Sequence, residues 1–228
     1  MTYRYAIYWA PPAGSPLAEI GEAWLGRRAE GGAIERTAPA GLSRDEIEQA
    51  TAEPRRYGLH ATLKPPFRLA AGRAAAELDE ALQGFARQTP PVAAPALRLE
   101  RIARFLALTP AAPAPGLDAL AAACVERFDV FRAPADEAEL ARRRAAALAP
   151  AQEANLLRWG YPYVMAEFRF HVSLTGAIVP GLARRLEKLL AERFAAATAA
   201  PFEIREIALF VEPAPGAPFR QARRFALA

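Results

Sequence analysis

Cysteine, lysine and histidine are scarce in this chain of 228 residues. The one cysteine, Cys124, excludes an intramolecular disulfide, and its apolar, helix-like surroundings indicate a small core residue. Lys64 and Lys188 are the only lysines among 29 basic residues. Together with the abundance of alanine and proline, this preference for arginine over lysine indicates the base composition of the coding sequence rather than recognition of a ligand by arginine.

Long apolar runs are also missing. No window approaches 18 uninterrupted apolar residues, so we expect no membrane span. The first five residues are not followed by the apolar stretch and small-residue cleavage site of a secretory signal, and a cytoplasmic location is therefore expected. The hydrophobic fraction of 53% and charged fraction of 24% are typical of a globular protein.

The net charge of +4 is mild and evenly spread, which does not indicate a nucleic-acid binder. It favours an anionic small molecule in a positive cleft. The length allows one large domain or two small ones.

Each of the two histidines is followed, two positions later, by a hydroxyl residue in an apolar segment. His60 precedes Thr62 and His171 precedes Ser173. Because side chains alternate between the faces of a strand, each histidine would share one face with its hydroxyl and leave the other face apolar. Serine and threonine total 11 of 228 residues, so a chance match at both histidines has a probability of roughly 1 in 400.

The remaining pattern predicts alternating helices and strands. Ser43 with Glu46, and Asp136 with Glu139, have the spacing of capping boxes at helix starts. Apolar periodicity and turn residues predict strands at 3–9, 57–63, 97–101, 104–108, 166–174, 202–211 and 219–226, and helices at 16–25, 43–52, 74–88, 117–128, 136–148, 150–159 and 180–197.

The order histidine strand, helix, strand, strand occurs twice, at 57–108 and at 166–226. Two such copies are too few for a solenoid, so we expect a duplication into two lobes.

Two histidines and two hydroxyls fit general acid–base catalysis at a phosphate ester. A neutral imidazole can take a proton from the attacking oxygen while a protonated one gives a proton to the leaving oxygen. The hydroxyls can hold the non-bridging phosphate oxygens. We expect no metal or other cofactor, because zinc would need three or four ligands with regular spacing.

The paired motif resembles that of the two-histidine (2H) phosphoesterase superfamily, in which His-x-Thr/Ser occurs once per lobe. The wider segments 57–67, 131–134 and 159–174 resemble the bacterial branch associated with phosphonate-utilisation genes. The resemblance implies an α+β, bilobal duplicated fold with two antiparallel sheets flanking a central cleft and helices on the outside. It also implies metal-independent phosphodiesterase or cyclic phosphodiesterase activity, on a small nucleotide- or ribose-type phosphate ester or an RNA end.

Carried over by position, His60 and His171 would be the acid–base pair, and Thr62 and Ser173 would hold the phosphate. We expect one bilobal domain over 1–228, with the first motif's lobe at about 43–109, a helical insertion at about 110–160 and the second motif's lobe at about 161–228. The sequence shows no recognisable oligomer interface, and a monomer is expected.

Four further residues are candidates for substrate binding. Lys64 and Thr175 each lie four positions after a histidine, and Arg169 lies two before His171, so regular strands would put all three on the catalytic face. The alternatives are a solvated strand end for Lys64, an ion pair for Arg169 and a turn role for Thr175. Tyr57 could stack on a base or ribose, or belong to the core.

Tyr161 and Tyr163 carry the same two alternatives as Tyr57, and the basic run 142–144 is expected to be a solvated helix face. Two other functions remain open. The cleft could bind phosphorylated sugars or RNA ends without chemistry, or the chain could be a structural protein with two buried histidines.

Overall fold

The computed structural model describes residues 3–228. Its strands are β1 (Arg4–Trp9), β2 (Ala61–Phe67), β3 (Val92–Ala94), β4 (Leu97–Ile102), β5 (Phe105–Pro110), β6 (Val172–Ser173), β7 (Phe202–Ile204), β8 (Glu206–Glu212) and β9 (Arg220–Ala226). Its α-helices are α1 (Pro16–Leu25), α2 (Arg44–Arg55), α3 (Ala75–Ala86), α4 (Pro115–Arg127), α5 (Glu137–Arg144), α6 (Pro150–Trp159) and α7 (Pro180–Thr198). The α+β class with two antiparallel sheets is confirmed.

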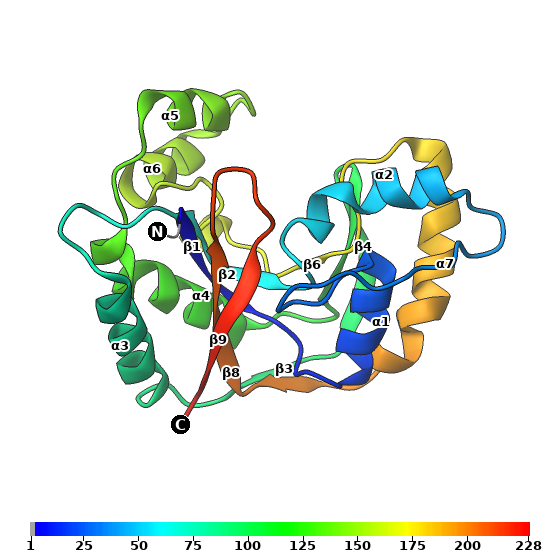
Figure 1. The fold of residues 1–228 in the computed structure, drawn as a ribbon, viewed down its shortest axis with the longest axis horizontal. Coiled ribbons are helices and arrows are strands. Elements are labelled where there is room, and N and C mark those ends of the chain that lie inside the picture. Colours follow the sequence, from blue (N-terminus) through cyan, green and yellow to red (C-terminus); the bar gives the residue numbers. More distant parts are fainter. Residues whose placement is uncertain (1–2) are drawn as a thin grey trace.

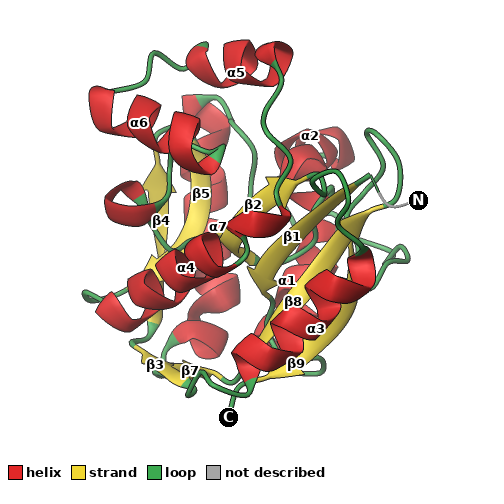
Figure 2. Ribbon diagram, turned by 90° about the vertical axis from the view of Figure 1, so that its left-hand side faces the viewer, coloured by secondary structure: helices red, strands yellow, loops and turns green. Residues whose placement is uncertain are grey.

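Both histidine motifs lie in one large sheet. Among residues 3–228, seven strands pair in the order β4-β5-β6-β2-β1-β8-β9, and β3 and β7 form the second sheet. Figure 1 shows α1, α2 and α7 around one end of the large sheet and α3, α4, α5 and α6 around the other. Figure 2 shows α5 at the top of the molecule with α6 beside it.

The strand order does not follow the chain order expected for two consecutive lobes. β4 and β5 come from the first half of the chain, yet they extend β6, which carries the second motif. β8 and β9 come from the end of the chain and extend β1 and β2. The two halves nevertheless repeat one order of elements: β2-α3-β3-β4-β5 and β6-α7-β7-β8-β9.

Local sequence signals explain several helix ends. The Ser15 side chain accepts a hydrogen bond from the first turn of α1, and Gly26 ends that helix in the left-handed conformation. Ser43 and Glu46 form the expected capping box of α2. The Asp136 side chain likewise caps α5.

The two motif strands differ most from expectation. β6 comprises only Val172–Ser173, because the preceding chain forms a 3-10 turn at Met165–Glu167 instead of continuing the predicted strand. β2 begins at Ala61 and runs on through Pro65 and Pro66. Since β6 pairs with β2 only at Ala61, the far end of β2 has a free edge that tolerates residues without an N–H donor.

The main core lies between the large sheet and its helices, and a smaller cluster covers the other face of β1 and β8. Val172, Leu174 and Phe170 belong to the main core. Trp24 donates its indole N–H to the carbonyl of Leu174 at 2.7 Å, which ties α1 to the end of β6. None of the helices within residues 3–228 has the length and apolar character needed to cross a membrane.

Candidate active site

Both motifs meet at the junction of β2 and β6. Ala61 pairs with Val172 in antiparallel register. If this register is continued by one residue in each direction, His60 comes opposite Ser173 and Thr62 comes opposite His171. Opposite residues share a face of the sheet with Cβ atoms roughly 5 Å apart, and diagonal residues are roughly 7–8 Å apart. The two imidazoles therefore lie on one diagonal and the two hydroxyls on the other.

Burial follows the alternation that the sequence predicts. His60, Thr62, His171 and Ser173 are partly exposed. Their neighbours are buried on the opposite face: Leu59, Ala61, Leu63, Phe170, Val172 and Leu174. One face of the junction therefore belongs to the core, and the other carries the four polar side chains.

A main-chain carbonyl two residues earlier holds each imidazole. His60 Nδ1 lies 2.9 Å from the carbonyl oxygen of Gly58, and His171 Nδ1 lies 2.8 Å from that of Arg169. A carbonyl can only accept, so Nδ1 carries the proton and Nε2 keeps its lone pair in each neutral ring. Nε2 of His60 lies 3.3 Å from the Thr62 hydroxyl. Gly58 has a φ of +78°, a conformation that other residues adopt with strain.

The environment favours the neutral form of both rings. Burial lowers the pKa of His60 to about 4, against the opposing effect of its bond to Gly58, and the charge of His171 contributes to the lowering. Burial also lowers the pKa of His171, and the charge of Arg169 acts in the same direction. A bound anion would oppose this lowering, because a negative charge stabilises an imidazolium.

Aromatic rings surround His60. The Tyr8 ring stacks on it at a centroid distance of 3.9 Å, and the Tyr57 ring lies 5.8 Å away. Tyr57 stacks in turn on Phe219 at 5.1 Å. Tyr8 was not anticipated from the sequence, although it lies opposite Thr62 in the β1–β2 pairing and therefore on the same face. Only this register, which the sequence does not give, could have identified it.

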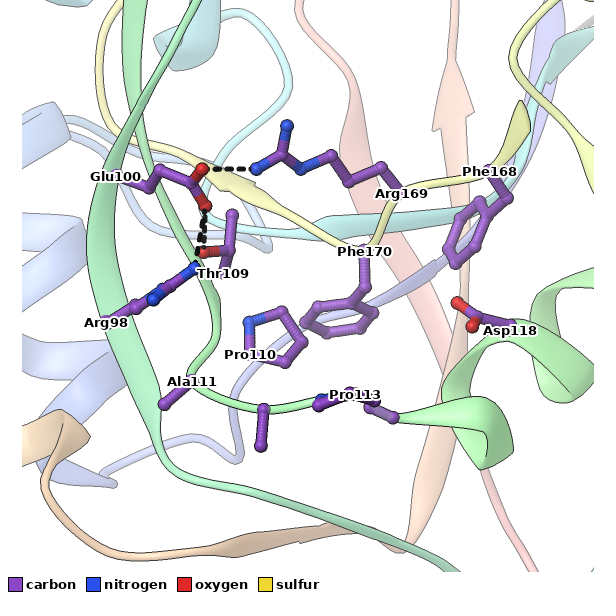
Figure 3. A pocket seen from close by; sticks show the side chains of 12 residues that line it. Arg98, Glu100, Thr109, Pro110, Ala111, Pro113, Asp118, Phe168, Arg169 and Phe170 are labelled. Atoms are coloured by element: carbon purple, nitrogen blue, oxygen red, sulfur yellow. Dashed lines mark hydrogen bonds and ion pairs between the residues drawn. The ribbon is translucent and has the colours of Figure 1, made fainter. Parts of the chain in front are cut away.

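The His171 ring lies 5.7 Å from the Phe105 ring, and polar side chains gather around Arg169, two residues before it. Figure 3 shows Glu100 of β4 binding the Arg169 guanidinium at 2.5 Å and accepting a hydrogen bond from the Thr109 hydroxyl at 2.7 Å. Arg98 lies 3.9 Å from the same carboxylate. These side chains line a cavity of about 410 Å³ together with Phe168, Phe170 and residues 110–114. The ion-pair alternative for Arg169 is thus present.

A protein-family match covers most of the helices and strands described above. Residues 62–220 match the family DUF1045, described as a protein of unknown function. The chain belongs to the DUF1045 family. The match begins at Thr62 and ends at the first residue of β9.

Two curated relatives resemble the DUF1045 chain along nearly its whole length. A Janthinobacterium sp. (strain Marseille) protein named ribose 1,5-bisphosphate phosphokinase PhnN is 39% identical over 226 residues, covering 97% of this chain and 50% of the relative. A Laribacter hongkongensis (strain HLHK9) protein of the same name is 36% identical over 236 residues, with 96% and 51% covered. The chain therefore spans about half the length of these relatives.

Among solved structures, apo LigT of E. coli aligns over 100% of this chain and 99% of its own, with a TM-score of 0.43 and 14% identity.

Lys64 of the DUF1045 chain lies away from the histidines, contrary to expectation. The pairing of β2 with β1 shifts between Tyr8 and Ile7, as in a β-bulge. Lys64 is consequently buried, and its ammonium donates to the carbonyl of Val125 at 3.0 Å and to Asp129 at 3.3 Å. It therefore contacts the C-terminal end of α4 and neither faces substrate nor forms a solvated strand end.

Thr175 also lies outside the histidine cluster. β6 ends at Ser173, so the expected alternation does not reach position 175. Thr175 is buried, and its hydroxyl accepts the N–H of Leu106 at 2.9 Å. The hydroxyl therefore joins the end of β6 to β5, which is neither substrate binding nor the turn role expected from the sequence.

Of the other tyrosines, Tyr161 packs edge-on against Tyr163 at 5.8 Å, and Tyr163 is exposed. Within residues 3–228, no group of three or more His, Cys, Asp or Glu side chains is placed to hold a metal ion.

Proposed function

We propose that this chain is a metal-independent phosphodiesterase or cyclic phosphodiesterase of the 2H type. Its substrate is a small nucleotide- or ribose-type phosphate ester. The observation that carries this proposal is the diagonal placement of His60 and His171 on one polar face, with Thr62 and Ser173 on the other diagonal. The four residues are those that the 2H resemblance assigns to catalysis.

The chemistry follows from two imidazoles of the same tautomer. A phosphate ester lies between the rings, within reach of both Nε2 atoms, and the hydroxyls of Thr62 and Ser173 donate to its non-bridging oxygens. One neutral Nε2 takes the proton of the attacking water. The other imidazole, protonated when the anionic substrate binds, gives its proton to the leaving ribose oxygen. The P–O bond to water forms as the P–O bond to the leaving group breaks.

A binding module without chemistry would use the same four side chains. The main-chain bonds to both Nδ1 atoms favour catalysis, because they keep both Nε2 atoms available for proton transfer. Phosphate binding by itself needs only hydrogen-bond donors, and not groups that accept a proton.

The phosphokinase name of the relatives has less support in this chain. A nucleotide-dependent kinase commonly carries the phosphate-binding pattern G-x-x-x-x-G-K-[ST]. Lys64 follows Leu63 and Lys188 follows Glu187, so neither lysine fits that pattern. The relatives' names do concern a phosphorylated ribose, which is the substrate class proposed here. A link to phosphonate metabolism, implied by the 2H resemblance, belongs to the same proposal.

The test is turnover of 2′,3′-cyclic nucleotides and ribose cyclic phosphates in the presence of EDTA. His60→Gln and His171→Gln should each reduce kcat by about 10²- to 10⁴-fold, because general acid–base catalysis contributes that much. Thr62→Val and Ser173→Ala should mainly weaken binding of the phosphate. Thermal unfolding of each variant separates lost chemistry from lost structure.

Full activity of both histidine variants on every accepted substrate would refute the catalytic roles. Sulfate binding that depends on Thr62 and Ser173, with no product from any ester after long incubation, would establish the binding module instead.

A further inference from the structure

The cavity lined by Arg169 and Glu100 continues the polar face that carries the histidine motifs. Ser173 of β6 pairs with Ala107 of β5, and Ala107 pairs with Glu100 of β4. Because paired residues share a face of a sheet, these three form one row across it. Two strand spacings of about 5 Å separate Ser173 from Glu100, a distance that one nucleotide can span. The cavity therefore lies within reach of an ester held by the histidine motifs.

One side of the cavity offers hydrogen-bond donors. Arg169 and Thr109 both donate to the Glu100 carboxylate and hold it in place. Arg98 lies 3.9 Å from the same carboxylate, which is too far for a hydrogen bond, and its side chain is 60% exposed. Two guanidinium groups thus share one carboxylate, and the N–H groups of Arg98 are available to an acceptor on a ligand.

The other side of the cavity offers an acceptor and an aromatic ring. Figure 3 shows the Asp118 carboxylate beside the Phe168 ring, on the side away from Glu100, with the Phe170 ring between the two sides. Asp118 is exposed in the first turn of α4, and within residues 3–228 no ion pair or hydrogen bond engages its carboxylate. It is therefore available to N–H donors of a ligand, and together with Glu100 it disfavours a second phosphate here.

We infer that this cavity binds the base of a nucleotide substrate, and that the base is guanine. The inference rests on the proposed function, because the base belongs to the ester whose phosphate lies between the imidazoles. Guanine alone among the common bases presents two adjacent N–H donors, at N1 and N2, which one carboxylate such as Asp118 accepts together. Its O6 and N7 accept from an arginine such as Arg98. Phe168 provides a ring for stacking, and the volume of about 410 Å³ is in the range of small-molecule sites.

Binding of three nucleotides tests the base site without requiring turnover. Calorimetry compares guanosine, inosine and adenosine 3′-monophosphates for the unmodified protein, Asp118→Asn and Glu126→Gln. The unmodified protein should bind the guanosine nucleotide about 10-fold more tightly than the inosine nucleotide, which lacks the 2-amino group. Asp118→Asn should weaken guanosine nucleotide binding by about 10- to 100-fold and adenosine nucleotide binding by less than about twofold. Glu126→Gln, at the exposed far end of α4, should leave all three affinities unchanged.

Three results would overturn the base site: no preference of the unmodified protein for guanosine over adenosine, equal weakening of all three nucleotides by Asp118→Asn in a folded variant, or no weakening at all. Phe168→Leu should weaken all three nucleotides, because stacking depends little on the identity of the base. Unchanged affinities in this variant would place the base outside the cavity. Thermal unfolding checks that each variant is folded.

Turnover then separates this inference from the proposed function. With guanosine and adenosine 2′,3′-cyclic phosphates as substrates, Asp118→Asn should raise KM for the guanosine ester only. If neither ester is turned over but guanosine nucleotide binding still depends on Asp118, the base site stands and the proposed chemistry fails. If both esters are turned over and respond alike to Asp118→Asn, the chemistry stands and the base site fails.

Discussion

At the residue scale, the two imidazoles share their main-chain anchors but differ in their neighbours. His60 lies among aromatic rings, and its lowered pKa comes first from burial. His171 lies beside the Arg169 guanidinium, and Glu100 neutralises part of that charge. Glu100 therefore influences His171 through the charge of Arg169.

Changes at this ion pair should move the pKa of His171 in opposite directions. Arg169→Met removes a positive charge that disfavours the imidazolium, so the pKa of His171 should rise towards its usual value. Glu100→Gln leaves the Arg169 charge without its partner, so that pKa should fall further. NMR titration in a His60→Gln background measures this directly, because only one histidine then remains.

Glu187→Gln is the matched control. Glu187 of α7 pairs at 2.6 Å with Arg101, which lies next to Glu100 in β4. It should leave the titration of His171 unchanged. Shifts of the same sign for Glu100→Gln and Arg169→Met would contradict the charge argument.

At the element scale, the bulge in β2 separates the catalytic strand from the end of α4. Thr62 faces the polar side, whereas Lys64, two residues later, reaches the carbonyl of Val125 and the carboxylate of Asp129. A cation at this end of a helix is also favoured by the helix dipole. The lysine thereby joins β2 to α4 and supports the strand from the core side.

Lys64→Met should therefore reduce stability and spare activity. The loss of bonds to a carbonyl and a carboxylate should cost about 1–3 kcal/mol in the free energy of unfolding. Asp129 keeps Arg132 as a partner at 2.7 Å, which limits the cost. The values of kcat and KM should change less than about twofold. Chemical denaturation and turnover assays measure the two quantities.

Lys188→Met, at the exposed second lysine, is the control and should change stability by less than about 0.5 kcal/mol. A large rise in KM for Lys64→Met with unchanged stability would restore the substrate-binding role expected from the sequence.

At the scale of the whole molecule, Glu212 connects three distant parts of the chain. It is fully buried at the end of β8, where Arg4 of β1 and Arg56, after α2, each bind its carboxylate at 2.5 Å. The N–H of Gly216 donates to it at 3.1 Å. These contacts join the start of the chain, the segment leading to the first motif and the β8–β9 turn.

Glu212→Gln should lower the free energy of unfolding by about 3–5 kcal/mol, because it leaves two partly buried arginines without their carboxylate. The exposed pair of Glu187 and Arg101 gives the comparison: Glu187→Gln should cost less than about 1 kcal/mol. Equal, small losses for the two variants, measured by thermal unfolding, would show that the buried network contributes little.

The sequence by itself determined the local features of this protein. The period-2 alternation around His60 and His171 gave the polar and apolar faces of both segments, and the capping residues gave the starts of α2 and α5. Such features depend on residues a few positions apart, so their physical causes are contained in a short stretch of chain.

Only the tertiary structure decided which other parts of the chain these segments contact. The pairing of Ala61 with Val172 sets the two imidazoles on one diagonal, and the bulge in β2 moves Lys64 to the core side. The pairing of β1 with β2 brings Tyr8 to His60, and the pairing of β4 and β5 with β6 brings Glu100 to Arg169. Strand register and order arise from packing between segments far apart in the chain, and no local pattern of residues encodes them.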